Sequence, residues 1–95
     1  MSTPVPGELY RHYKGGKYLV IAVSRNSDYP QDRSKKIVIY KQVYRGKNYP
    51  EEETWHRSLE EFCGYKTFQK NMNYKNKKFK AGEKVKRFTL LGTIQ

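Results

Sequence analysis

Residues 10–23 read YRHYKGGKYLVIAV, and this stretch carries most of the information about the fold. Its second half, Tyr18 to Val23, is rich in the β-branched and aromatic residues that favour strands. Its first half, Tyr10 to Tyr13, is a shorter strand candidate. Between the two lie Gly15 and Gly16, which suit a tight turn because glycine adopts positive φ without steric cost. The stretch therefore predicts a β-hairpin.

Working outward, the chain alternates further strand candidates with polar loops. Residues 37–44 form the second strong strand candidate, and residues 54–57, around Trp55, form a short one. The segments 24–36 and 45–53 are predicted loops, because they are rich in Asn, Asp, Ser, Gly and Pro. The last segment predicts a second hairpin, with strands at 77–80 and 85–91 and a turn at Ala81 and Gly82. Alternation along these strands is expected to turn Phe79 and Phe88 inward. Residues 64–76 are left unassigned.

One helical turn is expected between these strands. Ser58 and Glu61 have the spacing of a capping box, in which the hydroxyl caps the third amide onward and the carboxylate reaches back. The turn is predicted to end at Gly64. Five to six short strands and one helical turn favour an all-β fold, a small SH3-like barrel that closes to avoid exposed edges. A chain of 95 residues predicts a single domain at 8–92 after a loose lead-in at 1–7.

Several blocks of the sequence resemble a bacterial family, domain of unknown function 1653. They are Tyr10-Arg11-His12-Tyr13-Lys14-Gly15, Val38 and Tyr40 with Tyr44, Trp55-His56-Arg57-Ser58-Leu59-Glu60-Glu61-Phe62, and the closing Gly82, Val85 and Arg87-Phe88. The resemblance implies a small SH3-like barrel and no particular function. Asn26-Ser27-Asp28 stands where the family has His-Ser-Glu, so any role for that histidine is lost. A Lys- and Asn-rich insertion of roughly ten residues falls at about 64–78.

The resemblance bears on an ambiguity in the strand at 18–23. Its two alternating sets are Leu19, Ile21 and Val23 on one face and Tyr18, Val20 and Ala22 on the other. Periodicity alone favours burying the first set, which is the more aliphatic. The resemblance favours burying the second set, because family members tend to be polar at the position of Leu19. Both assignments remain open at this point.

Positive charge is concentrated near the carboxyl end of a chain whose formal net charge is +11. Nine of the twenty Lys and Arg residues lie between Lys66 and Arg87, with Glu83 as the one acid there. Such a density favours a polyanionic partner. Because the cluster is almost entirely Lys, it predicts phosphate contacts with little sequence choice. The expected nucleic-acid-binding residues are Lys66, Lys70, Tyr74, Lys75, Lys77, Lys78, Lys80, Lys84, Lys86 and Arg87, with Tyr74 the best candidate for base stacking.

Three alternatives to nucleic-acid binding stay open. The lysines can be a solvated surface. The chain can be a protein-interaction module that binds an acidic protein or associates with itself, with the acidic run at 51–53 and the basic insertion contacting opposite charges on the partner or on a second copy. Finally, an aromatic pocket can bind a small ligand, and its candidate residues are Tyr10, His12, Trp55 and Arg57. For the last set, the plainer expectation is that Trp55 packs in the core and Arg57 pairs with a nearby Glu.

No catalytic, metal or cofactor site is predicted. His12 has no carboxylate partner nearby in sequence, His56 is expected to be exposed, and Cys63 is expected to be an inert buried thiol. Two His and one Cys without close spacing do not form a zinc site. The opening residues lack a charged and apolar leader, and a single cysteine forms no internal disulfide, so a cytoplasmic location without membrane contact is expected. Without a catalytic pair, a non-enzymatic protein is expected.

Overall fold

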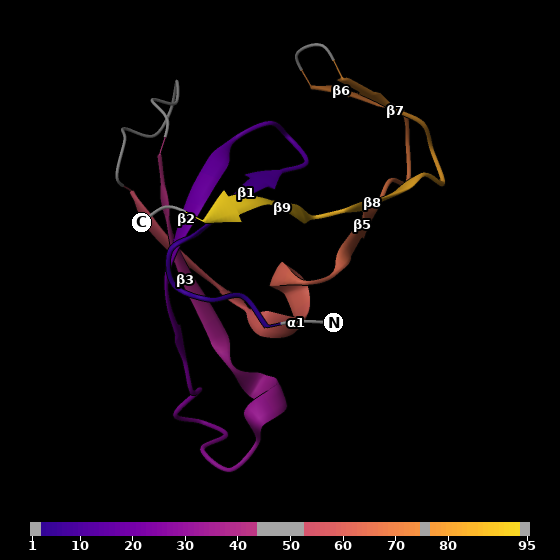
Figure 1. Ribbon diagram of the computed structural model, residues 1–95. Coiled ribbons are helices and arrows are strands. Elements are labelled where there is room, and N and C mark those ends of the chain that lie inside the picture. Colours follow the sequence, from indigo (N-terminus) through magenta and orange to yellow (C-terminus); the bar gives the residue numbers. More distant parts are fainter. Residues whose placement is uncertain (1–2, 44–52, 75–76, 94–95) are drawn as a thin grey trace.

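The computed structural model describes residues 3–43, 53–74 and 77–93, and the chain is predominantly β (Figure 1). Its strands are β1 (Glu8–His12), β2 (Lys17–Ser24), β3 (Ile37–Gln42), β4 (Thr54–Ser58), β5 (Tyr65–Thr67), β6 (Met72–Tyr74), β7 (Lys77–Phe79), β8 (Lys84–Lys86) and β9 (Phe88–Thr93). The helices are the 3-10 turn η1 (Arg33–Lys35) and the single α-helical turn α1 (Leu59–Phe62). The all-β expectation is confirmed at the level of class.

Five strands form one antiparallel sheet in the order β4-β3-β2-β1-β9. Strands β1 to β4 follow one another as a meander, and β9 returns from the far end of the chain to pair with β1. Among the described strands, β4 and β9 remain the two edges, so the pairings do not close a barrel. The predicted hairpin is confirmed: Gly15 has φ of +106° in the β1–β2 turn, and its amide donates to the His12 carbonyl.

A bulge in β2 resolves the question of which face is buried. Val20 pairs with Tyr40, but the next pair is Ala22 with Ile39, so Ile21 is an extra residue without a partner. Before the bulge, Tyr18 and Val20 face inward; after it, Val23 faces inward with Val38. Each periodic assignment is therefore correct for one half of the strand, because a one-residue shift exchanges the two faces.

The core lies between the inner face of the sheet and α1 (Figure 1). Its fully buried members are Val20, Val38, Tyr40, Phe62 and Phe88. The rings of Phe62, from α1, and Phe88, from β9, are stacked with centroids 4.1 Å apart. Phe88 is expected to turn inward by strand alternation, and its burial confirms this.

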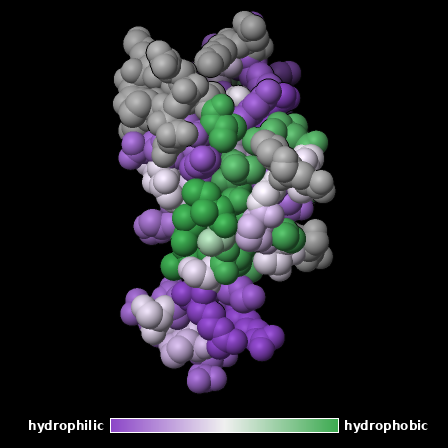
Figure 2. Space-filling model, turned by 60° about the vertical axis from the view of Figure 1, so that its left-hand side comes forward, coloured by the Kyte–Doolittle hydropathy of each residue, from purple (hydrophilic) through white to green (hydrophobic). Residues whose placement is uncertain are grey.

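The outer face of the same sheet is apolar and has no layer over it among the described residues. Register places Leu9, Leu19 and Ile39 on this face, opposite Tyr10, Tyr18 and Tyr40. Ile21, in the bulge, is 42% exposed. Figure 2 shows apolar side chains gathered in a band across this side of the molecule.

The predicted second hairpin is wrong in its pairing. Ala81 and Gly82 do form a turn, but the strands on its two sides pair elsewhere. Strand β7 pairs with β6, and β8 pairs with β5. Residues 64–76, unassigned from sequence, supply both partners, which raises the number of strands above the expected five to six.

Candidate nucleic-acid interface

Residues 65–74 and 77–86 form a two-stranded ribbon, named here the basic arm, that leaves the sheet after α1 and returns to it as β9 (Figure 1). Pairs β5–β8 and β6–β7 are its two ends. Between them, the Phe68 amide donates to the Glu83 carbonyl, and the Gly82 amide donates to the Phe68 carbonyl. The Asn71 side chain accepts from the Ala81 amide at 2.9 Å. The arm is thus continuous along its described length.

The inner side of the arm carries a small aromatic cluster. Phe68 and Phe79 are buried, and their rings are stacked at 4.6 Å. Both rings form T-shaped pairs with Tyr13, from the β1–β2 turn, with ring centroids 5.7 and 6.3 Å apart. The centroid of Tyr74 lies 6.0 Å from that of Tyr13. These contacts join the arm to the β1–β2 turn. The inner side of the ribbon is therefore occupied by ring packing.

The outer side carries lysines. Register places Lys84 and Lys86 on one side with Tyr65 and Thr67, while Lys66 and Val85 lie on the opposite side. Phe68 alternates with Thr67 and is buried, so the Lys84 and Lys86 side is the outer one.

The far end of the arm follows the same alternation. Lys78 pairs with Asn73 on the side opposite buried Phe79, so it also lies outward. Lys80, in the turn that follows, is exposed. The outer face is defined here by Lys78, Lys84 and Lys86, which register places on it, together with exposed Lys80 between β7 and β8.

No carboxylate neutralises this outer face in the described part of the chain. Glu83, the acid of the arm, accepts a hydrogen bond from the Lys80 amide at 3.0 Å rather than pairing with an ammonium group. The one ion pair among the described residues lies elsewhere, between Arg57 and Glu61. The ammonium groups of the outer face are thus available to an external anion.

The remaining predicted cations are distributed differently. Lys77 shares the inner side with Phe79, and Lys66 is partly buried beside Val85. Lys70 is exposed and lines a cavity of about 250 Å³ on the arm. Arg87 is partly buried at the base of the arm, and Lys75 lies outside the described residues. Among the described lysines, register therefore groups Lys78, Lys84 and Lys86 on the outer side and places Lys66 and Lys77 on the inner side.

The expected stacking residue, Tyr74, is not well placed for stacking on a base. It is partly buried in the inner cluster, and the Lys14 ammonium lies 5.3 Å from its ring centroid. Tyr65 is the better candidate, and sequence reasoning missed it. It is 51% exposed on the outer face, with the Lys84 ammonium 4.9 Å from its ring centroid. Strand β8, which pairs with β5, lies about twenty residues further along the chain. Only this pairing therefore shows that Lys84 and Lys86 lie beside Tyr65.

The predicted aromatic pocket is largely filled by packing. The Tyr10 ring meets Phe62 edge-on at 5.0 Å, and its hydroxyl donates to Glu8 at 3.0 Å. Burial, together with that hydrogen bond, raises the pKa of Tyr10. Trp55 packs against the core cluster. Tyr10 lines a cavity of about 260 Å³, whose lining does not include His12, Trp55 or Arg57.

His12 is held among aromatic rings at the junction of arm and sheet. Its ring centroid lies 4.2 Å from that of Tyr13 and 5.0 Å from that of Phe88. Its Nδ1 accepts a hydrogen bond from the Lys14 amide at 3.2 Å, which requires an unprotonated Nδ1. Burial, reinforced by the positive charges of Lys14, Arg57 and Arg87, lowers the pKa of His12 to about 4. The imidazole is neutral at physiological pH.

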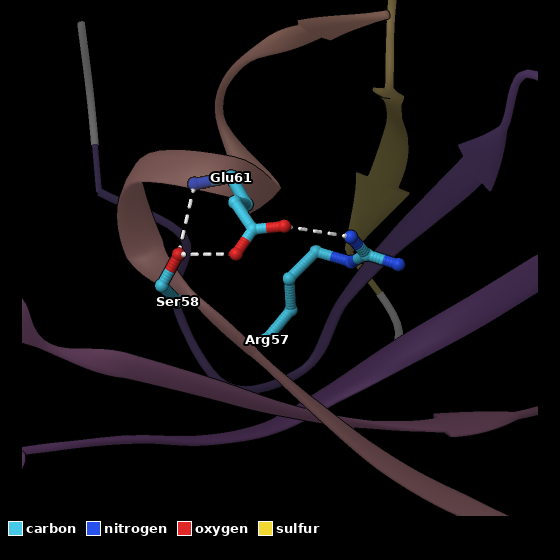
Figure 3. A network of polar contacts seen from close by, with 3 residues as sticks. All are labelled: Arg57, Ser58 and Glu61. Atoms are coloured by element: carbon cyan, nitrogen blue, oxygen red, sulfur yellow. Dashed lines mark hydrogen bonds and ion pairs between the residues drawn. The ribbon is translucent and has the colours of Figure 1, made fainter.

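Ser58, Arg57 and Glu61 form a network at the start of α1 (Figure 3). The Ser58 hydroxyl accepts from the Glu61 amide at 3.2 Å, as the capping prediction requires. The Glu61 carboxylate reaches back to that hydroxyl at 3.3 Å and to the Arg57 guanidinium at 3.1 Å. Burial lowers the pKa of Arg57, but hydrogen bonds to Tyr40 and Glu61 outweigh it and raise the pKa overall. The expected Arg57–Glu pairing is confirmed, and it fixes the turn from which the arm departs.

Cys63 follows α1 and is partly buried, and burial raises the pKa of its thiol. A raised pKa is the opposite of what a nucleophilic cysteine needs.

Within residues 3–43, 53–74 and 77–93, no three His, Cys, Asp or Glu side chains gather as a metal site would require. Glu51 and Glu52, two of the three acids in the predicted acidic run, lie outside these ranges. Within the same ranges, the helical turns are far too short to cross a bilayer.

Comparison with known proteins gives a family and no function. The family described as protein of unknown function (DUF1653) matches residues 8–90, and the chain belongs to it. The match confirms the resemblance found from sequence and spans the sheet, α1 and the basic arm. No curated protein and no solved structure matches the chain significantly. Any functional assignment therefore rests on the geometry of the site.

Proposed function

We propose that this chain is a non-enzymatic module that binds the phosphate backbone of nucleic acid through the outer face of its basic arm. The observation that carries the proposal is the run of Lys78, Lys80, Lys84 and Lys86 along one face without a carboxylate partner in the described residues. Backbone contacts of this kind neutralise phosphates and release counterions, which makes binding strongly dependent on salt. Lysine is a point charge, so the proposed binding has little sequence preference.

The direct test is a titration of the whole chain with short DNA and RNA at several salt concentrations. If the four lysines neutralise about four phosphates, log affinity falls against log salt with a slope of about −3 to −4. An absence of binding at low salt, or a dissociation constant near physiological salt above about 10⁻⁴ M, contradicts the proposal.

Two matched double variants localise the interface. Lys78→Glu/Lys84→Glu reverses two charges of the outer face, and Arg25→Glu/Arg33→Glu makes the same change in net charge in the exposed loop before β3. We expect the first to weaken binding at least about tenfold and to reduce the salt slope by about 2, one for each lost contact. The second is expected to have a smaller, uniform effect. Equal effects of the two variants would mean that net charge, not the arm, attracts the nucleic acid.

A second candidate function is protein interaction through the outer face of the sheet. The exposed apolar band in Figure 2 favours it, since a large apolar surface on a small domain often marks an interface. Arg11 and Lys41 lie on this same face by register, which favours a partner with carboxylates around an apolar surface. Two copies would bring these cations together, so the chain alone is expected to remain a monomer. A dimer that strengthens with added salt would instead identify a second copy as the partner.

We also propose a more specific fold, an SH3-like barrel, and a cellular location, the cytoplasm. The meander of four strands, the helical turn and a last strand that returns to β1 support an SH3-like barrel left open between β4 and β9. A single free cysteine supports a cytoplasmic location, where thiols stay reduced.

A further inference from the structure

A cavity lies at the root of the basic arm, where α1 passes into β5. Its volume is about 560 Å³. It is bounded by the N-terminal segment, η1, α1 and the first residue of β5, and its lining residues are Thr3, Ser34, Lys35, Leu59, Glu60, Cys63, Gly64 and Tyr65. The cavity thus joins the sheet body to the beginning of the arm.

The lining combines an apolar surface with a few polar groups. Leu59 and Cys63 are partly buried and pack against the core. Ser34 and Glu60 supply a hydroxyl and a carboxylate, which can accept hydrogen bonds. A planar, mainly apolar ligand with hydrogen-bond donors on its edge suits such a lining.

Tyr65 is shared between this cavity and the outer face of the arm. Its ring is 51% exposed, and the Lys84 ammonium lies 4.9 Å from the ring centroid. Lys86 pairs with Tyr65 across the ribbon and is close enough to Cys63 for its charge to act on the thiol. Two cations therefore lie beside an aromatic side chain that lines a partly apolar cavity.

We infer that this cavity receives an unpaired nucleobase, which stacks on Tyr65 while Lys84 and Lys86 contact the adjoining phosphates. The inference rests on the proposed function and narrows its ligand to single-stranded nucleic acid. A base within a duplex is already stacked and paired, so it reaches the cavity only at the cost of unpairing. Duplex DNA carries more charge per length, and binding by lysines alone would favour it.

Three oligonucleotides of equal length test the inference at one salt concentration: a single strand, the blunt duplex of the same sequence, and a single strand in which abasic sites replace the central nucleotides. The single strand is expected to bind most tightly, and the abasic strand to lose this advantage although it keeps every phosphate. Equal binding of the abasic and intact strands overturns the inference, as does tighter binding of the duplex.

Variants of Tyr65 supply the second measurement. Tyr65→Ala is expected to weaken binding of the intact single strand by about 5- to 150-fold, the range for losing one stacked base, while leaving duplex binding and the salt slope unchanged. Tyr65→Phe keeps the ring and is expected to bind as the parent chain does. Tyr29→Ala is the matched control, because Tyr29 is 52% exposed and also has a lysine ammonium near its ring, that of Lys35 at 5.7 Å.

The outcomes separate the two proposals. If no oligonucleotide binds, the proposed function fails, and the cavity assignment fails with it. If all three bind alike, and Lys78→Glu/Lys84→Glu weakens all of them, the basic arm binds phosphates and the cavity assignment alone is wrong. If Tyr65→Ala and Tyr29→Ala have the same effect, Tyr65 does not stack on a base.

Discussion

The sheet body and the basic arm each contain one stacked pair of phenylalanines, but the two pairs lie in very different surroundings. In the body, Phe62 and Phe88 are stacked at 4.1 Å within a core that a five-stranded sheet and α1 enclose. In the arm, Phe68 and Phe79 are stacked at 4.6 Å on a ribbon of two strands, and both rings contact Tyr13 of the β1–β2 turn.

This difference separates stability from binding. A two-stranded ribbon is marginal by itself and needs a surface to pack against. The arm uses its inner side for that packing, so its outer side stays free to carry charge. The body stabilises the fold, while the arm presents lysines at a distance from it. The comparison predicts that substitutions in the two regions have effects of different size and extent.

The largest effect is expected in the body. Phe62→Ala removes a fully buried ring and its stack with Phe88, which typically costs about 3–5 kcal/mol of unfolding free energy. Since small domains are stable by only about 5–15 kcal/mol, urea denaturation should show a greatly reduced midpoint or a largely unfolded chain. A loss below about 1 kcal/mol would mean that Phe62 is not part of the body core.

Phe79→Ala tests whether the arm opens separately from the body. We expect amide exchange in β6 and β7 to accelerate at least about tenfold, corresponding to about 1.4 kcal/mol, while β2 and β3 keep their protection. Hydrogen exchange read by NMR resolves the two regions. Lys78→Ala, at the neighbouring outward position, is the control and should change neither. Equal acceleration throughout the chain would show that arm and body unfold as one unit.

His12 lies where the two regions meet, and its titration probes that junction. The folded-state pKa of about 4 is below the ordinary value of 6.5, so the unfolded chain binds the proton more readily. The free energy of unfolding is therefore expected to fall as pH drops from about 6.5 to about 4, with no further loss from this group at lower pH. His12→Gln should remove that part of the dependence while leaving the contribution of the carboxylates. If the free energy of unfolding depends on pH in the same way in the parent chain and in His12→Gln, His12 is not a buried neutral imidazole.

The smallest effect concerns the cap that connects the regions. Ser58→Ala removes the hydroxyl that accepts from the Glu61 amide and is expected to cost about 1 kcal/mol. Ser58→Thr keeps a hydroxyl that can accept from the Glu61 amide and donate to the Glu61 carboxylate, and it should lose less. Ser27→Ala, in an exposed loop, provides a baseline in thermal denaturation. If Ser58→Ala and Ser27→Ala give the same transition, the cap does not contribute to stability.

Features decided by neighbouring residues were predictable from the sequence. The turn at Gly15, the Ser58 cap and the strands at 18–23 and 37–42 depend on backbone preference and on contacts within a few residues. Tyr44, the last residue of the second predicted strand, lies outside the described residues. The concentration of lysines near the carboxyl end is a fact of composition, and it indicated the part of the chain that became the candidate site. Inward burial of Phe79 and Phe88 followed from alternation along their strands.

Tertiary structure decided which strands pair and which side chains share a face. Local preference favoured pairing 77–80 with 85–91, but β5 and β6 offered partners that let Phe68 and Phe79 stack and dock on Tyr13. The bulge at Ile21 likewise shows only in the register of β2 against β3. Tyr65 came to lie beside Lys84 and Lys86 for the same reason. The sequence thus determined local conformation and charge, whereas long-range pairing, whose free energy depends on partners far along the chain, placed the lysines and an exposed ring on one side of the arm.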